Sequence, residues 1–220
     1  MPRIDEYLAR QTRREISARL EDDWERILRE IQFHPESRSL SREAFQKTFE
    51  YVETLYPKTA PCITAAKVYK NTNTAFCRKI GIPKEAGGAF LIRASAILIC
   101  YSRNHTPDDV ILVHELLHFA SQLMGSDFIS EAAEEDFAYR KSIPYLKANG
   151  FSDDWVLKTF LMPYYLGKAF VETTWSGQNF QVEEDAIRRR VESECQEMID
   201  AEMLPKEPAK KISNNRFDFI

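Results

Sequence analysis

The residues best suited to chemistry in this sequence are the five from His114 to His118, which read His-Glu-Leu-Leu-His. Two histidines four positions apart lie on one face of a helix, with about 5–6 Å between their β-carbons, so both imidazoles can bind one metal ion. Glu115 shares enough of that side for its carboxylate to act as a general base toward a metal-activated water. The motif therefore predicts one zinc ion per chain, bound by His114 and His118, and a hydrolytic reaction.

By composition alone, a His-Glu-x-x-His match should occur in roughly one chain per hundred of this length. The surroundings of the motif are therefore needed to distinguish a metal site from a chance match. Thr106-Pro107-Asp108-Asp109 predicts a helix start, with Thr106 as N-cap, and the helix should run to about Leu123 and end at Gly125. The segment 110–120 carries no charge except Glu115, so the carboxylate is expected on a largely buried helix. Burying it costs free energy unless a cation compensates. The alternative is a core helix whose histidines are satisfied by hydrogen bonds.

A catalytic zinc usually has a third protein ligand, and no histidine follows His118 in the sequence. The third ligand is therefore expected to be a carboxylate of the next helix, which offers Glu131, Glu134, Glu135 and Asp136. Glu135 is the preferred candidate, because the small Ala138 three residues later would let the two helices approach closely. Glu134 and Glu131 remain alternatives.

A His-Glu-x-x-His helix followed by a glutamate helix resembles the gluzincin branch of the zinc metallopeptidases, over roughly residues 105–145. The metzincin extension is excluded, because Ser121 and Met124 stand where its glycine and third histidine would be. The second gluzincin motif often reads Glu-x-x-Ala-Asp; here residues 135–139 keep the alanine but have Tyr139 for the aspartate. The resemblance implies a sheet whose edge strand binds an extended peptide, followed by the metal helix and the glutamate helix.

A second resemblance is carried by residues 134–145 together with Met162-Pro163-Tyr164, which are similar to small uncharacterised metallopeptidase-like proteins of large bacteriophages. The expected function is thus a zinc metallopeptidase that hydrolyses peptide bonds, with Glu115 as general base and zinc bound by His114, His118 and Glu135. The candidates for an oxyanion donor are Tyr139, Tyr164, Tyr165 and His105. The alternative function is a non-catalytic zinc-binding structural or regulatory protein of the same fold.

The remaining sequence predicts a mainly helical α+β fold, in which a small antiparallel sheet precedes the metal helix and the glutamate helix. The expected helices are an amphipathic one from Ile4 to Ile31, one capped by Ser41 and ending at Leu55, the helix of the motif, one from Ser130 to Asn149-Gly150, one opened by Ser152 and interrupted near Pro163, and a charged surface helix at 182–203. The expected strands are residues 63–69, 75–80, 89–92 and 96–101, punctuated by Gly81, Pro83, Gly87 and Gly88. We expect a single domain over 1–204, made of 1–57, 62–150 and 151–204, and a tail over 205–220.

Composition narrows the partners that this chain can have. A net charge of −4 and a pI near 5.7 leave no excess of basic residues for a nucleic acid, so a peptide or protein substrate is expected instead. Residues 1–20 lack the apolar stretch of a secretory signal, and no segment is expected to span or bind a membrane. The four cysteines have no paired spacing, which favours free thiols in a reducing cytoplasm. The sequence leaves the oligomeric state open.

Overall fold

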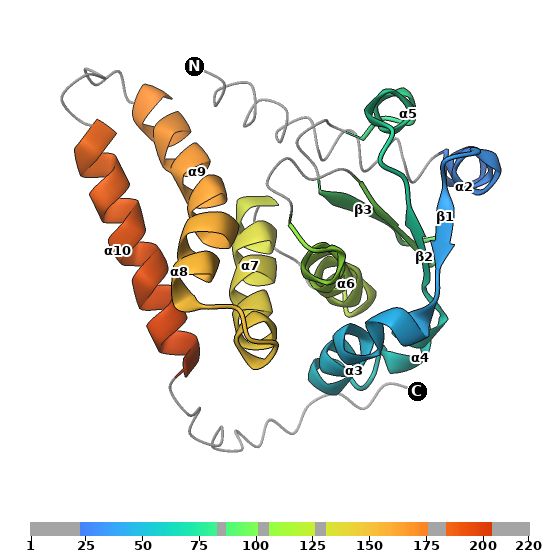
Figure 1. Ribbon diagram of the computed structural model, residues 1–220, viewed down its shortest axis with the longest axis horizontal. Coiled ribbons are helices and arrows are strands. Elements are labelled where there is room, and N and C mark those ends of the chain that lie inside the picture. Colours follow the sequence, from blue (N-terminus) through green and yellow to red (C-terminus); the bar gives the residue numbers. More distant parts are fainter. Residues whose placement is uncertain (1–22, 83–86, 101–105, 126–130, 176–183, 204–220) are drawn as a thin grey trace.

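The computed structural model describes residues 23–82, 87–100, 106–125, 131–175 and 184–203. Helices make up most of this part of the chain and surround one small sheet (Figure 1). The elements, in chain order, are α2 (Trp24–Phe33), β1 (Arg38–Leu40), η1 (Arg42–Phe45), α3 (Gln46–Leu55), α4 (Ala60–Ala65), β2 (Lys67–Lys70), α5 (Thr74–Lys79), β3 (Gly88–Leu91), β4 (Ala96–Ile99), α6 (Asp108–Leu123), α7 (Glu131–Ala148), α8 (Asp153–Trp155), η2 (Val156–Leu161), α9 (Met162–Trp175) and α10 (Glu184–Met203).

The sheet has four strands in the order β1-β2-β4-β3, so β1 and β3 are its edges. The outer pairs are antiparallel, but β2 and β4 pair in parallel, with Lys67 opposite Ala96. The expectation of a mainly helical α+β fold is thus confirmed, whereas the expectation of a purely antiparallel sheet is wrong. The parallel pair is possible because the connection from β2 to β4 is long and contains α5 and β3, as a parallel crossover requires.

Two of the expected strands differ in the structure. Residues 75–80 form most of the helix α5, which Asn73 caps by accepting a hydrogen bond from the Phe76 amide at 2.9 Å. The expected strand at 63–69 is divided, since α4 ends at Ala65 and β2 begins only at Lys67. Short apolar runs fit a buried strand and a helix equally well, which explains both errors. β1 is a further strand that the sequence did not predict.

The helix of the motif, α6, lies in the middle of the molecule, between the sheet and α7 (Figure 1). It begins at Asp108 with Pro107 at the N-cap position, so the predicted cap at Thr106 is wrong by one residue, and Pro107 makes no side-chain cap hydrogen bond. Gly125 follows its end with a φ of +65°, as expected for a helix stop. Every residue from Val110 to Ser121 is buried, because elements pack on all sides of this stretch.

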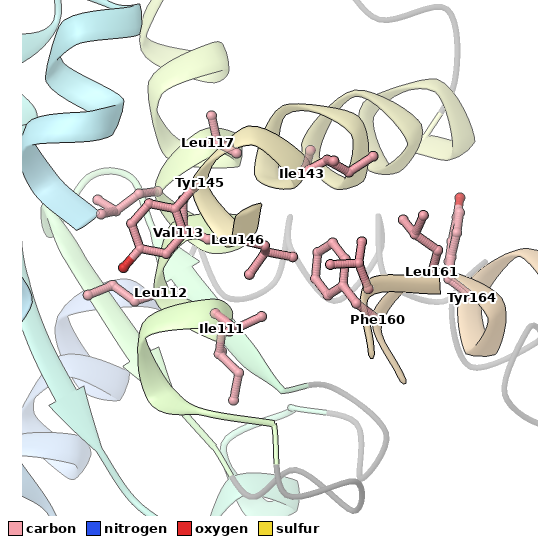
Figure 2. Packing of buried hydrophobic residues seen from close by; sticks show 14 of the residues in the cluster. Ile111, Leu112, Val113, Leu117, Ile143, Tyr145, Leu146, Phe160, Leu161 and Tyr164 are labelled. Carbon is pink, nitrogen blue, oxygen red and sulfur yellow. The ribbon is translucent and has the colours of Figure 1, made fainter. Parts of the chain in front are cut away.

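One large apolar cluster joins α6 to the helices on one side of the sheet (Figure 2). This cluster includes Leu112, Val113 and Leu117 of α6, Ile143 and Leu146 of α7, and Phe160 and Leu161 of η2 (Figure 2). A second cluster covers the opposite face of the sheet, where Ile27 and Ile31 of α2 and Phe76 of α5 meet Leu98 of β4. The side chains of β2, β3 and β4 alternate between the two clusters, which fixes the register of these strands.

The C-terminal helices form the outer layer beside α7 (Figure 1). Ser152 caps α8 by accepting a hydrogen bond from the Trp155 amide, as expected, and the predicted interruption takes the form of the π-helical stretch η2, just before Pro163. The helix α10 is more than the expected surface helix. Its Ile187, Val191, Cys195, Met198 and Ile199 are buried against the large cluster, and its charged residues occupy the other face.

Several predictions fall outside the described residues: the part of the first helix before residue 23, the cap at Ser130, the start of the last helix at 182–183, and the tail at 205–220. The second predicted helix is split into η1 and α3, and Ser41 precedes η1 without a side-chain cap hydrogen bond. Within the described residues, no helix is both long and apolar enough to cross a bilayer.

Candidate metal centre

The helices α6 and α7 bring the two motif histidines and one glutamate together. The Nε2 atoms of His114 and His118 lie 3.1 Å apart. The carboxylate of Glu135 reaches both rings, with Oε2 at 3.4 Å from Nε2 of His114 and Oε1 at 3.7 Å from Nε2 of His118. The close approach is possible because Ala138, one turn after Glu135, is fully buried between the helices. The three side chains thus offer one ligand atom each, all within 4.8 Å of one another.

The polar groups of this centre are largely withdrawn from water. His114 is 9% exposed, Glu115 and His118 are 4% exposed, and Glu135 is 5% exposed. Burial by itself lowers the pKa of His118, but the hydrogen bond to Glu134 and the negative charge of Glu135 outweigh burial and raise it. The centre is therefore a negative environment inside the protein, which favours a bound cation.

Glu134 contacts the outer nitrogen of His118 and not the inner one. Its Oε1 lies 3.1 Å from Nδ1 of His118 and also accepts a hydrogen bond from Nε2 of Gln122 at 3.2 Å. Burial raises the pKa of Glu134, but the hydrogen bond and charge of His118 outweigh burial and lower it, so the carboxylate is ionised and can only accept. Nδ1 of His118 must then carry the proton, which in the neutral ring leaves a lone pair on Nε2, directed at Glu135 and His114.

The geometry fits a zinc ion. Ligand atoms at about 2.0–2.1 Å from a tetrahedral zinc are roughly 3.3 Å from one another, close to the separations of 3.1, 3.4 and 3.7 Å found here. Two imidazole nitrogens and one carboxylate oxygen are also the donor types of catalytic zinc sites with three protein ligands. Without a cation, these close contacts require protons on the imidazole rings, because two ring nitrogens that both carry lone pairs repel each other at 3.1 Å. Of the three candidate ligands, His114 differs in that its buried Nδ1 has no hydrogen-bond partner among the described residues.

Aromatic rings enclose the two histidines on opposite sides. Phe90 of β3 stacks on His118, with ring centroids 5.9 Å apart and an interplanar angle of 14°. On the other side, the Tyr139 ring lies 4.7 Å from that of His114, and Phe160 packs against both. Packing against these rings, in place of a hydrogen bond to Nδ1, holds the orientation of His114.

The structure separates the carboxylates and tyrosines that the sequence left as alternatives. Asp136 faces away from the centre, because it accepts hydrogen bonds from the Tyr165 hydroxyl at 2.6 Å and from Nε of Arg140 at 2.8 Å. Among the candidate oxyanion donors, the Tyr164 hydroxyl donates to the backbone oxygen of Ala132 at 3.5 Å. The ring of Tyr139, in contrast, packs on the motif histidine His114. The side chain of Glu131 and all of residue 105 lie outside the described part of the chain.

Sequence reasoning missed the contributions of β3 and the role of Glu134. Phe90 stacks on His118, and Gly88 lies against Glu115, although both residues are far from the motif in the sequence. A Gly-Gly pair directly before an apolar strand was the available signal, since glycine at a strand often marks a close backbone approach. The sequence offered Glu134 only as an alternative metal ligand. Its contact with the outer nitrogen of His118 depends on side-chain conformation, which the sequence does not show.

No protein-family model, curated protein or solved structure matches this chain.

Proposed function

We propose that this protein is a zinc-dependent metallopeptidase of the His-Glu-x-x-His type, similar to the gluzincins, in which His114, His118 and Glu135 bind one zinc ion. The observation that carries the proposal is the convergence of these three side chains within 4.8 Å, with a buried Glu115 beside them on α6. A zinc ion in this position supplies Lewis-acid activation of a water molecule and of a carbonyl oxygen.

The protein's own groups supply the remaining steps. The Glu115 carboxylate accepts the proton that the attacking water loses and then donates it to the nitrogen of the leaving amine, so that water and a peptide bond give an acid and an amine. Glu134 fixes the tautomer and ring plane of His118 through Nδ1. The rings of Phe90 and Tyr139 limit the entry of water, which strengthens the electrostatic interactions of the centre.

The substrate class that we propose is a peptide or a flexible protein segment, and the place of action is a reducing cytoplasm. All four cysteines are free thiols, and three of them, Cys77, Cys100 and Cys195, are buried in the core. A free thiol inside an apolar core behaves as a small hydrophobic residue and requires no oxidising compartment.

The testing experiment measures the zinc content of the purified protein by elemental mass spectrometry, beside the variants His118→Ala and Glu135→Ala. The expected result is about one zinc per chain in the wild type, none in His118→Ala and weakened binding in Glu135→Ala. A wild-type protein that neither contains zinc nor takes it up would contradict the proposal.

The matched catalytic test uses Glu115→Gln, which keeps the shape of the side chain and removes the base. This variant should bind zinc as the wild type does but hydrolyse fluorescein-labelled casein and a fluorogenic peptide library at least about 100-fold more slowly. Zinc binding without any Glu115-dependent hydrolysis would instead favour the non-catalytic zinc protein considered from the sequence.

A further inference from the structure

The edge strand β3 lies along the metal helix in a way that places a glycine against the proposed base. Gly88 and Phe90 alternate with Ala89 and Leu91, and Leu91 is buried in the cluster on the opposite face of the sheet. Phe90 faces α6 and stacks on His118, and Gly88 faces Glu115 and Ile111, one turn earlier on the same helix. Gly88 is buried.

The distances at Gly88 leave no room for a side chain. A Cβ atom there would lie 2.8 Å from Cγ of Glu115, 3.0 Å from its Oε1 and 3.0 Å from Cγ2 of Ile111. Carbon atoms in contact are normally separated by about 3.5–4.0 Å. The conflict concerns Cγ of Glu115, which is close to the helix backbone and cannot move as freely as the end of a side chain.

Glycine is required here by the close approach and not by its backbone conformation. The glycines of the described chain with a left-handed φ are Gly81, Gly125 and Gly150, so another residue could adopt the φ of Gly88. Glycine inside a strand weakens the strand, and its presence at a buried position is explained by the neighbour that it accommodates.

We propose that Gly88 is a positioning residue for Glu115: its bare backbone forms the wall against which the carboxylate of the base is held. A side chain at position 88 would push Cγ of Glu115 away from β3 and shift the carboxylate relative to the centre. The zinc-binding residues would stay in place, because none of the three atoms nearest to the added Cβ belongs to His114, His118 or Glu135. This inference rests on the proposed function, since it assigns Gly88 a role through the proposed base.

The neighbouring Gly87 provides a matched control. A Cβ atom there would lie 3.5, 3.6 and 3.7 Å from atoms of the Ile111 side chain, which is ordinary van der Waals contact. Gly87→Ala and Gly88→Ala therefore add the same methyl group to adjacent residues of one segment. They differ in whether the methyl group meets Glu115.

The first measurement is a cycle of melting temperatures on zinc-free protein, so that it depends on neither metal nor substrate. Gly88→Ala should lower the melting temperature by about 3 °C or more, as overpacking does in a domain of this size. In a Glu115→Ala background, Gly88→Ala should lower the melting temperature by less than half as much, because Cγ of Glu115, the atom nearest to the added methyl group, is absent. Gly87→Ala should change the melting temperature by about 1 °C or less. An equal cost of Gly88→Ala in both backgrounds would overturn the inference.

The second measurement compares zinc affinity with hydrolysis of labelled casein. Gly88→Ala should bind zinc as tightly as Gly87→Ala and the wild type, while kcat falls about tenfold or more at a nearly unchanged KM. If the wild type is active and Gly88→Ala is as active as Gly87→Ala, the inference is wrong and the proposed function stands. If the wild type is inactive, the proposed function fails, and the melting cycle alone decides whether Gly88 positions Glu115.

Discussion

Two polar clusters, each containing at least one histidine, contrast in how their groups are satisfied. Around Asn71, which is fully buried, the side-chain nitrogen donates to Nδ1 of His34 at 3.0 Å and to the Ser37 hydroxyl at 2.8 Å, and the side-chain oxygen accepts from the Asn73 amide at 2.8 Å. In the α6–α7 cluster, formed by His114, His118, Glu134 and Glu135, ring nitrogens face each other at 3.1 Å beside carboxylate oxygens.

The difference lies in the charge that each cluster places inside the protein. The Asn71 cluster matches each donor with an acceptor and is neutral when His34 is neutral, so the fold itself satisfies it. The α6–α7 cluster instead gathers the carboxylates of Glu134 and Glu135 around two imidazole rings, an arrangement that a bound cation would stabilise. The two clusters should therefore respond differently to zinc and to substitution.

The largest effect should come from zinc itself. At a free zinc concentration of about 1,000 times the dissociation constant, the free energy of unfolding should rise by about 4 kcal/mol, because the proposed zinc site is assembled only in the folded chain. His118→Ala should abolish this increase and His34→Ala should keep it. Chemical denaturation with and without zinc measures both, and equal stabilisation of the two variants would remove the distinction between the clusters.

Asn71→Ala should destabilise the protein by about 2–4 kcal/mol without changing zinc affinity. The substitution removes the amide of a fully buried residue and leaves the part-buried Ser37 hydroxyl and Asn73 backbone amide without this partner, which costs more than the loss of an exposed hydrogen bond. Urea denaturation and zinc titration of the folded variant provide the two numbers. A loss of zinc affinity would mean that the two clusters are coupled.

Glu134→Ala should weaken zinc binding by about 10–100-fold, since outer partners of ligand histidines contribute on this scale. Glu134→Gln should weaken zinc binding less than Glu134→Ala does, because the amide oxygen can still accept a hydrogen bond from Nδ1–H of His118. Competition with a chelator of known affinity measures both values, and Gln122→Ala, which removes the second partner of Glu134, serves as the mild control. An unchanged affinity in Glu134→Ala would show that packing alone orients His118.

The smallest effect concerns Asp136, which follows Glu135 in the sequence. Its carboxylate accepts hydrogen bonds from Tyr165 and Arg140. Tyr165→Phe removes the hydroxyl that donates to Asp136 and should cost about 1 kcal/mol at neutral pH. Burial is the main cause that raises the pKa of Tyr165 far above the ordinary value of about 10, and the hydrogen bond to Asp136 and its negative charge raise it further. The wild type should therefore lose stability as the pH rises through the ordinary tyrosine pKa, because the unfolded chain can then ionise this tyrosine and the folded chain cannot. The deficit of Tyr165→Phe should shrink above about pH 10 in denaturation curves, and a constant deficit would contradict the pKa shift.

The sequence predicted the helical elements around the centre better than the sheet. The motif, the apolar residues 110–120 and Gly125 predicted α6 closely, because a long apolar run and a stop signal are local properties. The helix α5 was mistaken for a strand, since a run of six residues is too short to show either period, and the three residues of β1 carry almost no signal. The parallel pairing of β2 with β4 depends on contacts between distant segments.

The candidate centre shows the same division between local and long-range information. Helical geometry pointed to Glu135, and the structure brings its carboxylate to both motif histidines. The contact of Glu134 with Nδ1 of His118 and the approach of Gly88 to Glu115 arise from the packing of α7 and β3 against α6. No spacing within one segment encodes such contacts.

The π-helical stretch η2 has a consequence for how this chain tolerates changes in length. A π-turn contains one residue more than an α-turn, so η2 has the geometry of an α-helix with one residue inserted between α8 and α9. Removing the exposed Lys158 could convert η2 to α-helix while Tyr164 and Tyr165 keep facing α7. A deletion between Glu135 and Ala138 would turn every later residue of α7 by about 100° relative to Glu135 and separate it from the residues packed around Ala138. The two helices beside the centre therefore differ in how freely their lengths can evolve.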